Sequence, residues 1–337
     1  MGNLSALQSL TLRKNNFSGV IPLVSLKNCT ELEVLDAAEN QFAGNVLTWI
    51  GERFSKMKIL ILRSNNFQGL LPMELCQLSS LQILDLDYNN LSENIPSCIN
   101  NFSAMVTVDH SVSKDMNYFS FYIDMNYISY YVEHASLVRR GIKYEYSTIL
   151  NLVRAIDLSK NNISGEIPRE VTALKELLSL NLSHNSLTGR IPHNIGAMRE
   201  IEDIDFSANQ LSNEIPESIS NLTFLRYLNL TDNKLSGRIP TSTQIQGFEA
   251  SCFTGNDLCG SPLPKNCTET PEHENGGGKD GDEEEVDWFY VSMALGFVVG
   301  FCGLLSPLLI SRRWRYIYCG FLNRLEDKIY IAARKYY

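Results

Sequence analysis

The sequence predicts a solenoid in which short parallel strands stack along one axis. A pattern of 16 residues, LxxLxLxxNxLxGxIP, begins at Leu177 and begins again at Ile201 and at Leu225, so the repeat is 24 residues long. Self-similarity at a fixed period of this length is typical of a leucine-rich solenoid. Such a solenoid presents one extended surface, which favours a binding function over a catalytic one.

Each part of the pattern has a structural reason. The segment from Leu180 to Leu182 predicts a short strand whose alternate side chains point inward. Asn185, which follows it, is expected to turn the chain, because its amide can bond the backbone of adjacent coils. The Gly-x-Ile-Pro segment predicts the convex return, with Ile in the core and Pro where no ladder donor is needed. Stacked coils therefore predict an α/β leucine-rich-repeat fold with a parallel concave sheet.

Eight repeats are readable, and the second is the weakest, because Ala37 replaces a core Leu and no Ile-Pro follows Gly44. They begin near Leu7, Leu32, Met57, Leu81, Val153, Leu177, Ile201 and Leu225. The concave face of the first four is charged and uneven, with Arg13, Lys14, Glu39, Arg63, Asp87 and Tyr88. We take Arg63, Asp87 and Tyr88 as candidate contacts for a ligand or a co-receptor. The stripe of Asp157, Asn181, Asp205 and Asn229 in the later repeats is interpreted as part of the repeat pattern.

An interruption separates the fourth repeat from the fifth. Residues 105–152 do not fit the template, and they are rich in Tyr and Phe, which a polar linker would not be. Two interpretations are open: two decayed coils that only preserve the superhelix, or an inserted island that folds onto the concave side. We favour the island, since Tyr and Arg are frequent anchors of binding surfaces.

A cap and two disulfides are expected. Residues 244–268 follow the last repeat and would cover the open end of its core. The pairs expected to be bonded are Cys259 with Cys267, inside this cap, and Cys76 with Cys98, at nearly the same phase of adjacent coils. Cys29 is interpreted as a small buried apolar residue, and Cys252 has no obvious partner.

Glycosylation sequons all precede residue 270. The candidate sites are Asn3, Asn16, Asn28, Asn90, Asn101, Asn162, Asn221 and Asn266. Two further sequons, at Asn181 and Asn229, would point from the concave sheet, where we expect glycans to be excluded. This distribution indicates that the front part of the chain is luminal or extracellular.

A single membrane span is expected near the C-terminal end. Residues 269–287 form an acidic spacer, and 288–310 are 23 residues without a charge, enough for a transmembrane helix. Residues 311–337 form a short tail with seven basic and two acidic residues, which the positive-inside rule places in the cytoplasm. Ser292, Gly296 and Gly300 form a small-xxx-small ridge that permits close helix packing, although Gly is common in such helices by chance.

The expected organisation places repeats at 1–104, the island at 105–152 and further repeats at 153–243, ahead of the cap, spacer, span and tail. The opening segment from Met1 to Leu4 lies inside a repeat and resembles no secretion signal, so we expect the chain to be an N-terminally truncated part of a longer type I membrane protein.

Catalytic and nucleic-acid-binding functions find no support in the sequence. No metal-ligand spacing, phosphate loop, nucleophile elbow or kinase motif is present, so we expect neither an enzyme nor a metal or other cofactor. The net charge is −9, and removing the tail, which carries +5, leaves −14 for the remainder. An acidic exterior of this kind argues against nucleic acid as a partner.

The chain resembles the C-terminal part of the plant leucine-rich-repeat receptor-like proteins, a group that includes the fungal-xylanase and Cf-type immune receptors. The segments that carry the resemblance are 75–81 (LCQLSSL), 153–168 with its IDLS core, and 258–263 (LCGSPL). The order of coils, island, four coils, acidic spacer, GxxxG span and short tail adds to it.

The resemblance implies a plasma-membrane receptor that lacks its own kinase. Such receptors bind an extracellular peptide, protein or glycan, pair with a leucine-rich-repeat adaptor kinase through the span and spacer, and recruit a co-receptor kinase. The family's island often contains Tyr, eight residues, then Lys-Gly; here Tyr131 precedes Arg140 and Gly141 at that spacing, and Arg alters the donor geometry. Two alternatives stay open: a non-signalling truncated or decoy copy, and an inhibitor-type binder of secreted hydrolases, against which the span counts.

Overall fold

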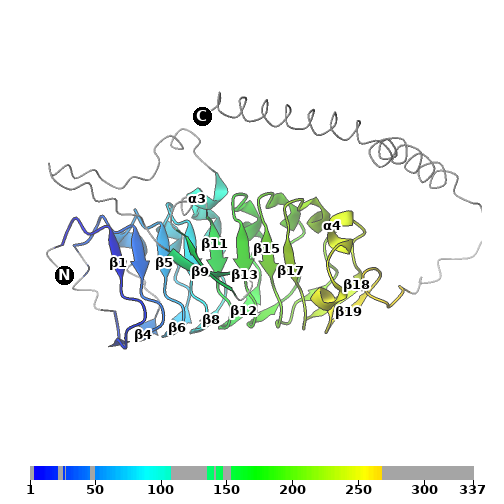
Figure 1. Cartoon of the computed structure of the whole chain (residues 1–337), viewed down its shortest axis with the longest axis horizontal. Coiled ribbons are helices and arrows are strands. Elements are labelled where there is room, and N and C mark those ends of the chain that lie inside the picture. Colours follow the sequence, from blue (N-terminus) through cyan, green and yellow to red (C-terminus); the bar gives the residue numbers. More distant parts are fainter. Residues whose placement is uncertain are drawn as a thin grey trace, which may run out of the picture. The chain divides into compact units, whose positions relative to one another are not determined.

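The computed structural model of the chain describes residues 4–21, 26, 28–45, 50–107 and 153–267, together with the backbone of strands β9 (Ala135–Arg139) and β10 (Ile142–Tyr146). Eight parallel strands form one long sheet in which they lie side by side in chain order (Figure 1). They are β1 (Ser9–Thr11), β3 (Val34–Asp36), β5 (Ile59–Ile61), β7 (Ile83–Asp85), β11 (Ala155–Asp157), β13 (Ser179–Asn181), β15 (Asp203–Asp205) and β17 (Tyr227–Asn229). The expected parallel-sheet solenoid is therefore confirmed.

The register of this sheet follows from the repeat. Leu180 pairs with Ile156 on one side and with Ile204 on the other, so the same position of each repeat meets its equivalent in the next coil. These middle residues are fully buried in the main core, and their strand neighbours point to the opposite face because side chains alternate along a strand. Ala37, the small residue of the second repeat, is also fully buried there.

A second set of strands returns the chain on the other side of the core. One sheet contains β2 (Ser18–Gly19), β4 (Gln41–Asn45), β6 (Asn66–Leu70), β8 (Asn90–Glu93), β12 (Asn162–Glu166) and β14 (Ser186–Thr188). Another contains β16 (Ser212–Asn213), β18 (Lys234–Arg238) and β19 (Asp257–Cys259). Each coil thus contributes a strand to two opposite layers, and the Leu and Ile side chains fill the space between them.

Short helices follow most of the Ile-Pro segments. The 3₁₀ helices are η1 (Met73–Gln77), η2 (Ser97–Asn101), η4 (Arg169–Ala173), η5 (Ile195–Ala197), η6 (Glu217–Asn221) and η7 (Ala250–Phe253). The α-helices are α2 (Ile50–Arg53), α3 (Ser103–Val106) and α4 (Thr243–Gln246). Pro suits the position before η1, η2, η4 and η6 because its fixed φ is compatible with the extended cap and no donor is lost there.

The fourth and fifth coils are direct neighbours, although 69 residues separate the end of β7, at residue 85, from the start of β11, at residue 155. Ile83 pairs with Ala155, and the amide of Leu86 donates to the carbonyl of Asp157 at 2.8 Å. No further strand of the long sheet therefore lies between these two coils. Within residues 108–152 the described elements are β9 and β10, which pair antiparallel in a separate two-stranded sheet.

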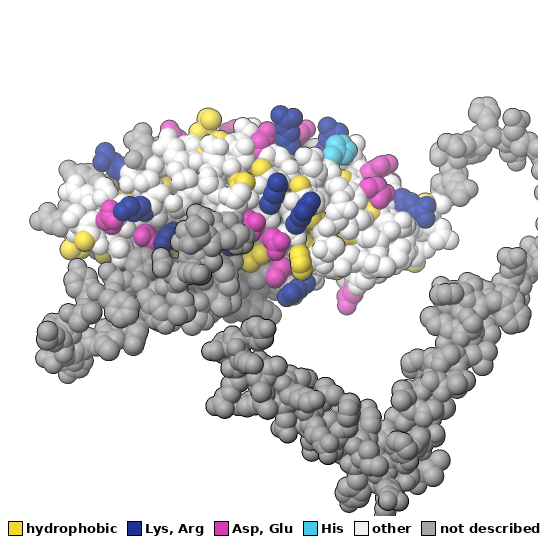
Figure 2. Space-filling view, turned by 90° about the horizontal axis from the view of Figure 1, so that it is seen from above, with side chains coloured by type: hydrophobic (Ala, Val, Ile, Leu, Met, Phe, Trp, Pro, Cys, Tyr) yellow, Lys and Arg dark blue, Asp and Glu magenta, His cyan; other side chains and the backbone are white. Residues whose placement is uncertain are grey.

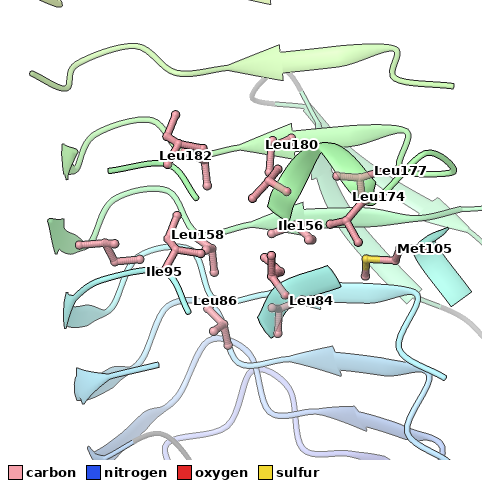
Figure 3. Close-up of a cluster of buried hydrophobic side chains, with 14 of the residues drawn as sticks. Leu84, Leu86, Ile95, Met105, Ile156, Leu158, Leu174, Leu177, Leu180 and Leu182 are labelled. Atoms are coloured by element: carbon pink, nitrogen blue, oxygen red, sulfur yellow. The ribbon is translucent and has the colours of Figure 1, made fainter. Parts of the chain in front are cut away.

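The fifth coil is a composite of two segments. Met105, on α3, is fully buried in the main core beside Leu174 and Leu177 (Figure 3), and its carbonyl accepts from the amide of Glu176 at 3.0 Å. Val153, by contrast, belongs to a second apolar cluster outside the main core. Met105 thus supplies the first core position of this coil, and the chain leaves the coil after α3 and re-enters it at the start of β11.

The last coil is covered by α4, η7 and β19, with Ile245, Phe253 and Leu258 buried beneath them. Within the described residues no helix is long and apolar enough to cross a membrane. The expected spacer, span and tail at 269–337, including Ser292, Gly296 and Gly300, lie outside the described residues.

Candidate functional site

The outer face of the long sheet, formed by the first and third residue of each strand, is the candidate binding surface. Its first-position row changes character along the solenoid. Val34, Ile59, Ile83 and Ala155 are register partners, and they form a buried apolar cluster separate from the main core. The equivalent residues of the next three coils are Ser179, Asp203 and Tyr227. The first-position row is therefore apolar from the second coil to the fifth and polar after it.

A network of ion pairs runs beside the apolar row in the first four coils. Arg13 contacts Glu39 at 2.7 Å and Asp36 at 3.7 Å. Arg63 contacts Glu39 at 3.5 Å and Asp85 at 2.9 Å. The side chains of Arg63 and Asp85 are both 4% exposed, so this pair is shielded from water and joins the third coil to the fourth.

Three carboxylates meet at the junction of the fourth and fifth coils. Asp85 and Asp157 are register partners, and Asp87 forms an ion pair with Lys160 at 3.4 Å. Burial, with the neighbouring Asp87 carboxylate, raises the pKa of Asp85 to about 8. Burial and the Asp85 and Asp87 carboxylates raise the pKa of Asp157 to about 8 as well.

The later coils have a regular polar pattern on the same face. The hydroxyl of Ser183 donates to Asn181 at 2.8 Å, and the hydroxyl of Ser207 donates to Asp205 at 2.6 Å. Tyr227 donates its hydroxyl to Asp205 at 3.2 Å, and burial raises the pKa of this tyrosine. These bonds hold the polar side chains within and between coils.

An asparagine ladder sets the turn after each strand of the long sheet. Asn209 donates to the carbonyl of Leu182 in the preceding coil at 3.0 Å and accepts from the amide of Leu187 at 2.9 Å. Both cross-coil bonds recur at Asn40, Asn65, Asn89, Asn161, Asn185, Asn233 and Asn256. The ladder crosses the interruption, because Asn161 bonds Leu86 and Leu91 of the fourth coil.

The residue before each of these asparagines has a left-handed backbone, and its side chain is exposed at Tyr88, Lys160, His184 and Asp232. Tyr88, at this position, has φ of 55° and is 62% exposed, whereas Arg63 and Asp87 are only 3% and 9% exposed. Seen from above in Figure 2, cationic and anionic side chains are interspersed over the described surface. At the last coil, Phe224 is 52% exposed next to the exposed Arg226.

The family model "Leucine Rich Repeat" matches five segments, at residues 80–102, 153–174, 176–198, 200–222 and 224–244. Two tomato (Solanum lycopersicum) relatives match over most of the chain. Receptor-like protein EIX2 is 42% identical over 317 residues, which are 92% of this chain and 31% of the relative. Receptor-like protein EIX1 is 43% identical over 325 residues, which are 93% of this chain and 31% of the relative.

The chain belongs to the plant leucine-rich-repeat receptor-like proteins. It spans about a third of the length of the two tomato receptor-like proteins. The same fold occurs in the plant peptide hormone receptor RGFR1, solved in complex with RGF2, with a TM-score of 0.57 and 26% identity over 77% of this chain and 34% of that one. It also occurs in the ectodomain of the Arabidopsis thaliana membrane receptor kinase GASSHO1/SCHENGEN3, with a TM-score of 0.54 and 27% identity. That match covers 80% of this chain and 32% of the other.

The three candidate contacts of this receptor-like protein that the structure describes do not form one exposed cluster. Arg63 and Asp87 are buried in ion pairs, and Tyr88 projects from the edge. The island candidates Tyr131, Arg140 and Gly141 lie outside the described residues, and in sequence the last two fall between β9 and β10. The sequence did not reveal the apolar cluster or the grouping of Asp85 with Asp87 and Asp157, although aligning residues 34, 59, 83 and 155 by repeat phase would have revealed the former.

The cysteines and sequons occupy defined places. Disulfides join Cys76 to Cys98 and Cys259 to Cys267, the expected pairs, whereas Cys29 is buried and reduced and Cys252 is a half-buried thiol whose pKa is raised by burial. Exposed sequon asparagines are Asn16, Asn28, Asn90, Asn101, Asn162, Asn221 and Asn266, and Asn3 lies outside the described residues. Asn181 and Asn229 are half-buried, with their amides bonded to Asp157 and Asp205.

Metal binding finds no support in the described coils. No group of three or more His, Cys, Asp or Glu side chains among the described residues is placed to hold an ion. The site is therefore a surface with a buried ionic framework and exposed side chains along its edge.

Proposed function

We propose that the chain is part of a cell-surface receptor-like protein without its own kinase, which binds an extracellular ligand and signals through partner receptor kinases in plant defence. The observation that carries the proposal is the long parallel sheet, whose outer face is continuous across the interruption. Matches to receptor-like proteins over nine-tenths of the chain support it. The charge-free stretch at 288–310 and the basic tail support a single plasma-membrane span with the repeats outside.

Ligand contact is assigned to exposed side chains rather than to the buried framework. Tyr88 stands at the edge of the fourth coil, beside the coil from which the chain leaves after α3. Tyr131, Arg140 and Gly141 of the interruption complete this ligand-binding set, since Tyr and Arg are typical anchors. Arg63 and Asp87 act as positioning residues, because each is buried and already holds an oppositely charged partner.

Signalling is assigned to partners through two further surfaces. The exposed Phe224 and Arg226 mark the end of the outer face that a co-receptor kinase would contact. Ser292, Gly296 and Gly300 would allow an adaptor kinase helix to approach closely within the membrane. The acidic spacer at 269–287 would contact a basic patch on the same adaptor.

The experiment is co-purification of the full chain with a co-expressed leucine-rich-repeat adaptor kinase from plant membranes. Gly296→Leu combined with Gly300→Leu should abolish recovery of the kinase, because the enlarged side chains block close helix contact. Ala294→Leu combined with Val298→Leu is the matched control, since it adds apolar bulk two residues away, and it should leave recovery unchanged. Unchanged recovery with the glycine variant, or equal loss with both, would contradict the proposed docking.

A further inference from the structure

The third-position row of the outer face alternates between carboxylate and amide in the later coils. Asn181 donates its amide to the carboxylate of Asp157 at 3.1 Å, and Asn229 donates to Asp205 at 3.4 Å. Each carboxylate of this row therefore has an amide donor in the next coil. This arrangement avoids placing two negative charges side by side across a strand pair.

The junction of the fourth and fifth coils breaks this alternation. Asp85 and Asp157 are direct register partners, because the chain skips from one coil to the next across the interruption. Asp85 is 3% exposed, and Asp87 lies two residues further along, also buried. Two ionised carboxylates this close and this shielded from water repel each other strongly, which favours the protonated form of one of them.

The hydrogen bonds of Ser159 give a second, independent argument. Its hydroxyl oxygen lies 2.6 Å from Asp157 Oδ1 and 2.9 Å from Asp87 Oδ1. It also accepts from the amide of Asn181 at 3.1 Å. A serine hydroxyl has one hydrogen, so it can donate at full strength to only one of the two carboxylates. A hydrogen on a carboxyl group would supply the other oxygen–oxygen contact.

The described cations do not balance the cluster. Arg63 faces Asp85 but is shared with Glu39, and Lys160 faces Asp87 with a side chain that is 51% exposed. Arg13 is engaged by Glu39 and by Asp36, the acidic residue at the equivalent position of the second coil. Among the described residues, three carboxylates at the junction are thus faced by one buried shared cation and one solvated cation.

We propose that Asp85, Asp87 and Asp157 together retain at least one proton up to neutral pH, and that full ionisation of the cluster weakens the stacking of the fourth coil on the fifth. Ionisation would place repelling charges across the β7–β11 pairing, which holds together the two sides of the interruption. The solenoid therefore has a pH-sensitive joint at the point where the chain leaves and re-enters it. This inference stands independently of the proposed receptor function.

The direction of the pH dependence follows from the shifted groups. The pKa of Asp85 and of Asp157 is raised from the ordinary 3.8 to about 8. Between these values the folded chain binds more protons than the unfolded chain, so the stability falls as the pH rises from about 4 to about 8. The repulsion is complete above the upper value.

The test compares two isosteric variants of the full chain. Asp157→Asn removes a proton-binding group at the junction. Asp205→Asn removes the equivalent carboxylate of a coil in which both register neighbours, Asn181 and Asn229, are uncharged. The midpoint temperature of thermal unfolding should decrease as the pH is raised from 5 to 9 in the wild type and in Asp205→Asn. The decrease should be clearly smaller in Asp157→Asn. The infrared carbonyl band of a protonated carboxyl group should be present at pH 6 in the first two and reduced in the third.

Asp85→Asn provides a second variant if Asp157→Asn does not fold, and it should flatten the pH dependence in the same way. The proposal is overturned if the wild type shows no protonated carboxyl band at pH 6. It is also overturned if Asp157→Asn and Asp205→Asn change the pH dependence of the unfolding midpoint equally.

Discussion

Replacing Asn209 by Ala tests the asparagine ladder, because the structure allows the loss to be counted group by group. Asn209 is 8% exposed and donates to the carbonyls of Leu182, Phe206 and Ser207. Each of these carbonyls also accepts from a second donor. The carbonyl of Leu182 accepts from the side chain of Asn185, that of Phe206 from the side chain of Asn233, and that of Ser207 from the backbone amide of His184. The carbonyls therefore stay bonded in the variant.

The amide of Leu187 is different, because it loses the acceptor that Asn209 Oδ1 provides at 2.9 Å. A buried donor left without a partner costs about 1–3 kcal/mol. Loss of the three bonds that Asn209 donates adds a smaller cost, because those carbonyls keep a second donor. We therefore expect Asn209→Ala to lower the free energy of unfolding by about 2–3 kcal/mol in total. Urea unfolding of the full chain measures this value, and hydrogen exchange should become faster at the amide of Leu187.

Asn15→Ala is the matched control. Asn15 holds the same place in the first coil, but it is exposed, and among the described residues its amide bonds the carbonyls of Leu12 and Arg13 in its own coil and none in another coil. Its replacement should cost less than about 1 kcal/mol, as expected for an exposed position. An equal loss for Asn15→Ala and Asn209→Ala would refute the reasoning that cross-coil bonds set the contribution of the ladder.

Two further predictions concern the cap and the disulfides. Gly255→Ala should lower the free energy of unfolding by about 2–4 kcal/mol, because φ is 73° and a Cβ would lie 2.9 Å from backbone atoms of Asp232. Gly19 is the control, since it has a similar φ of 81° but open space around the added Cβ. In the same urea assay Gly19→Ala should cost only about 1 kcal/mol. Replacing Cys76 and Cys98 together by Ser should lower the free energy of unfolding by about 3 kcal/mol relative to the oxidised wild type on chain-entropy grounds. Equal stability of the two proteins under non-reducing conditions would show that the bond adds nothing.

The regular part of this molecule could be predicted from the sequence because the repeat fixes both phase and neighbour. The position of Leu180 in its repeat is enough to place it in the core between Ile156 and Ile204. The same reasoning indicated the disulfide between Cys76 and Cys98, whose α-carbons are 5.8 Å apart on adjacent coils.

The irregular part could not be predicted, since it depends on contacts between segments that the repeat does not relate. The template assigned Met105 to the island, but its side chain fills the core position that Val153 would occupy in an uninterrupted coil. Phase alone placed Arg63 and Asp87 on the concave face and could not show that each is buried against an opposite charge. The proton-sharing carboxylates arise only because β7 and β11 become neighbours.

Site-resolved glycan occupancy of the full chain in plant cells tests the account most directly, because it depends on both the fold and the side of the membrane. The account predicts glycans at the exposed Asn162 and Asn221, removable from intact protoplasts by an added glycosidase, and none at the half-buried Asn181 and Asn229. An unmodified chain, or glycans at Asn181 and Asn229 in place of the exposed sites, would contradict it.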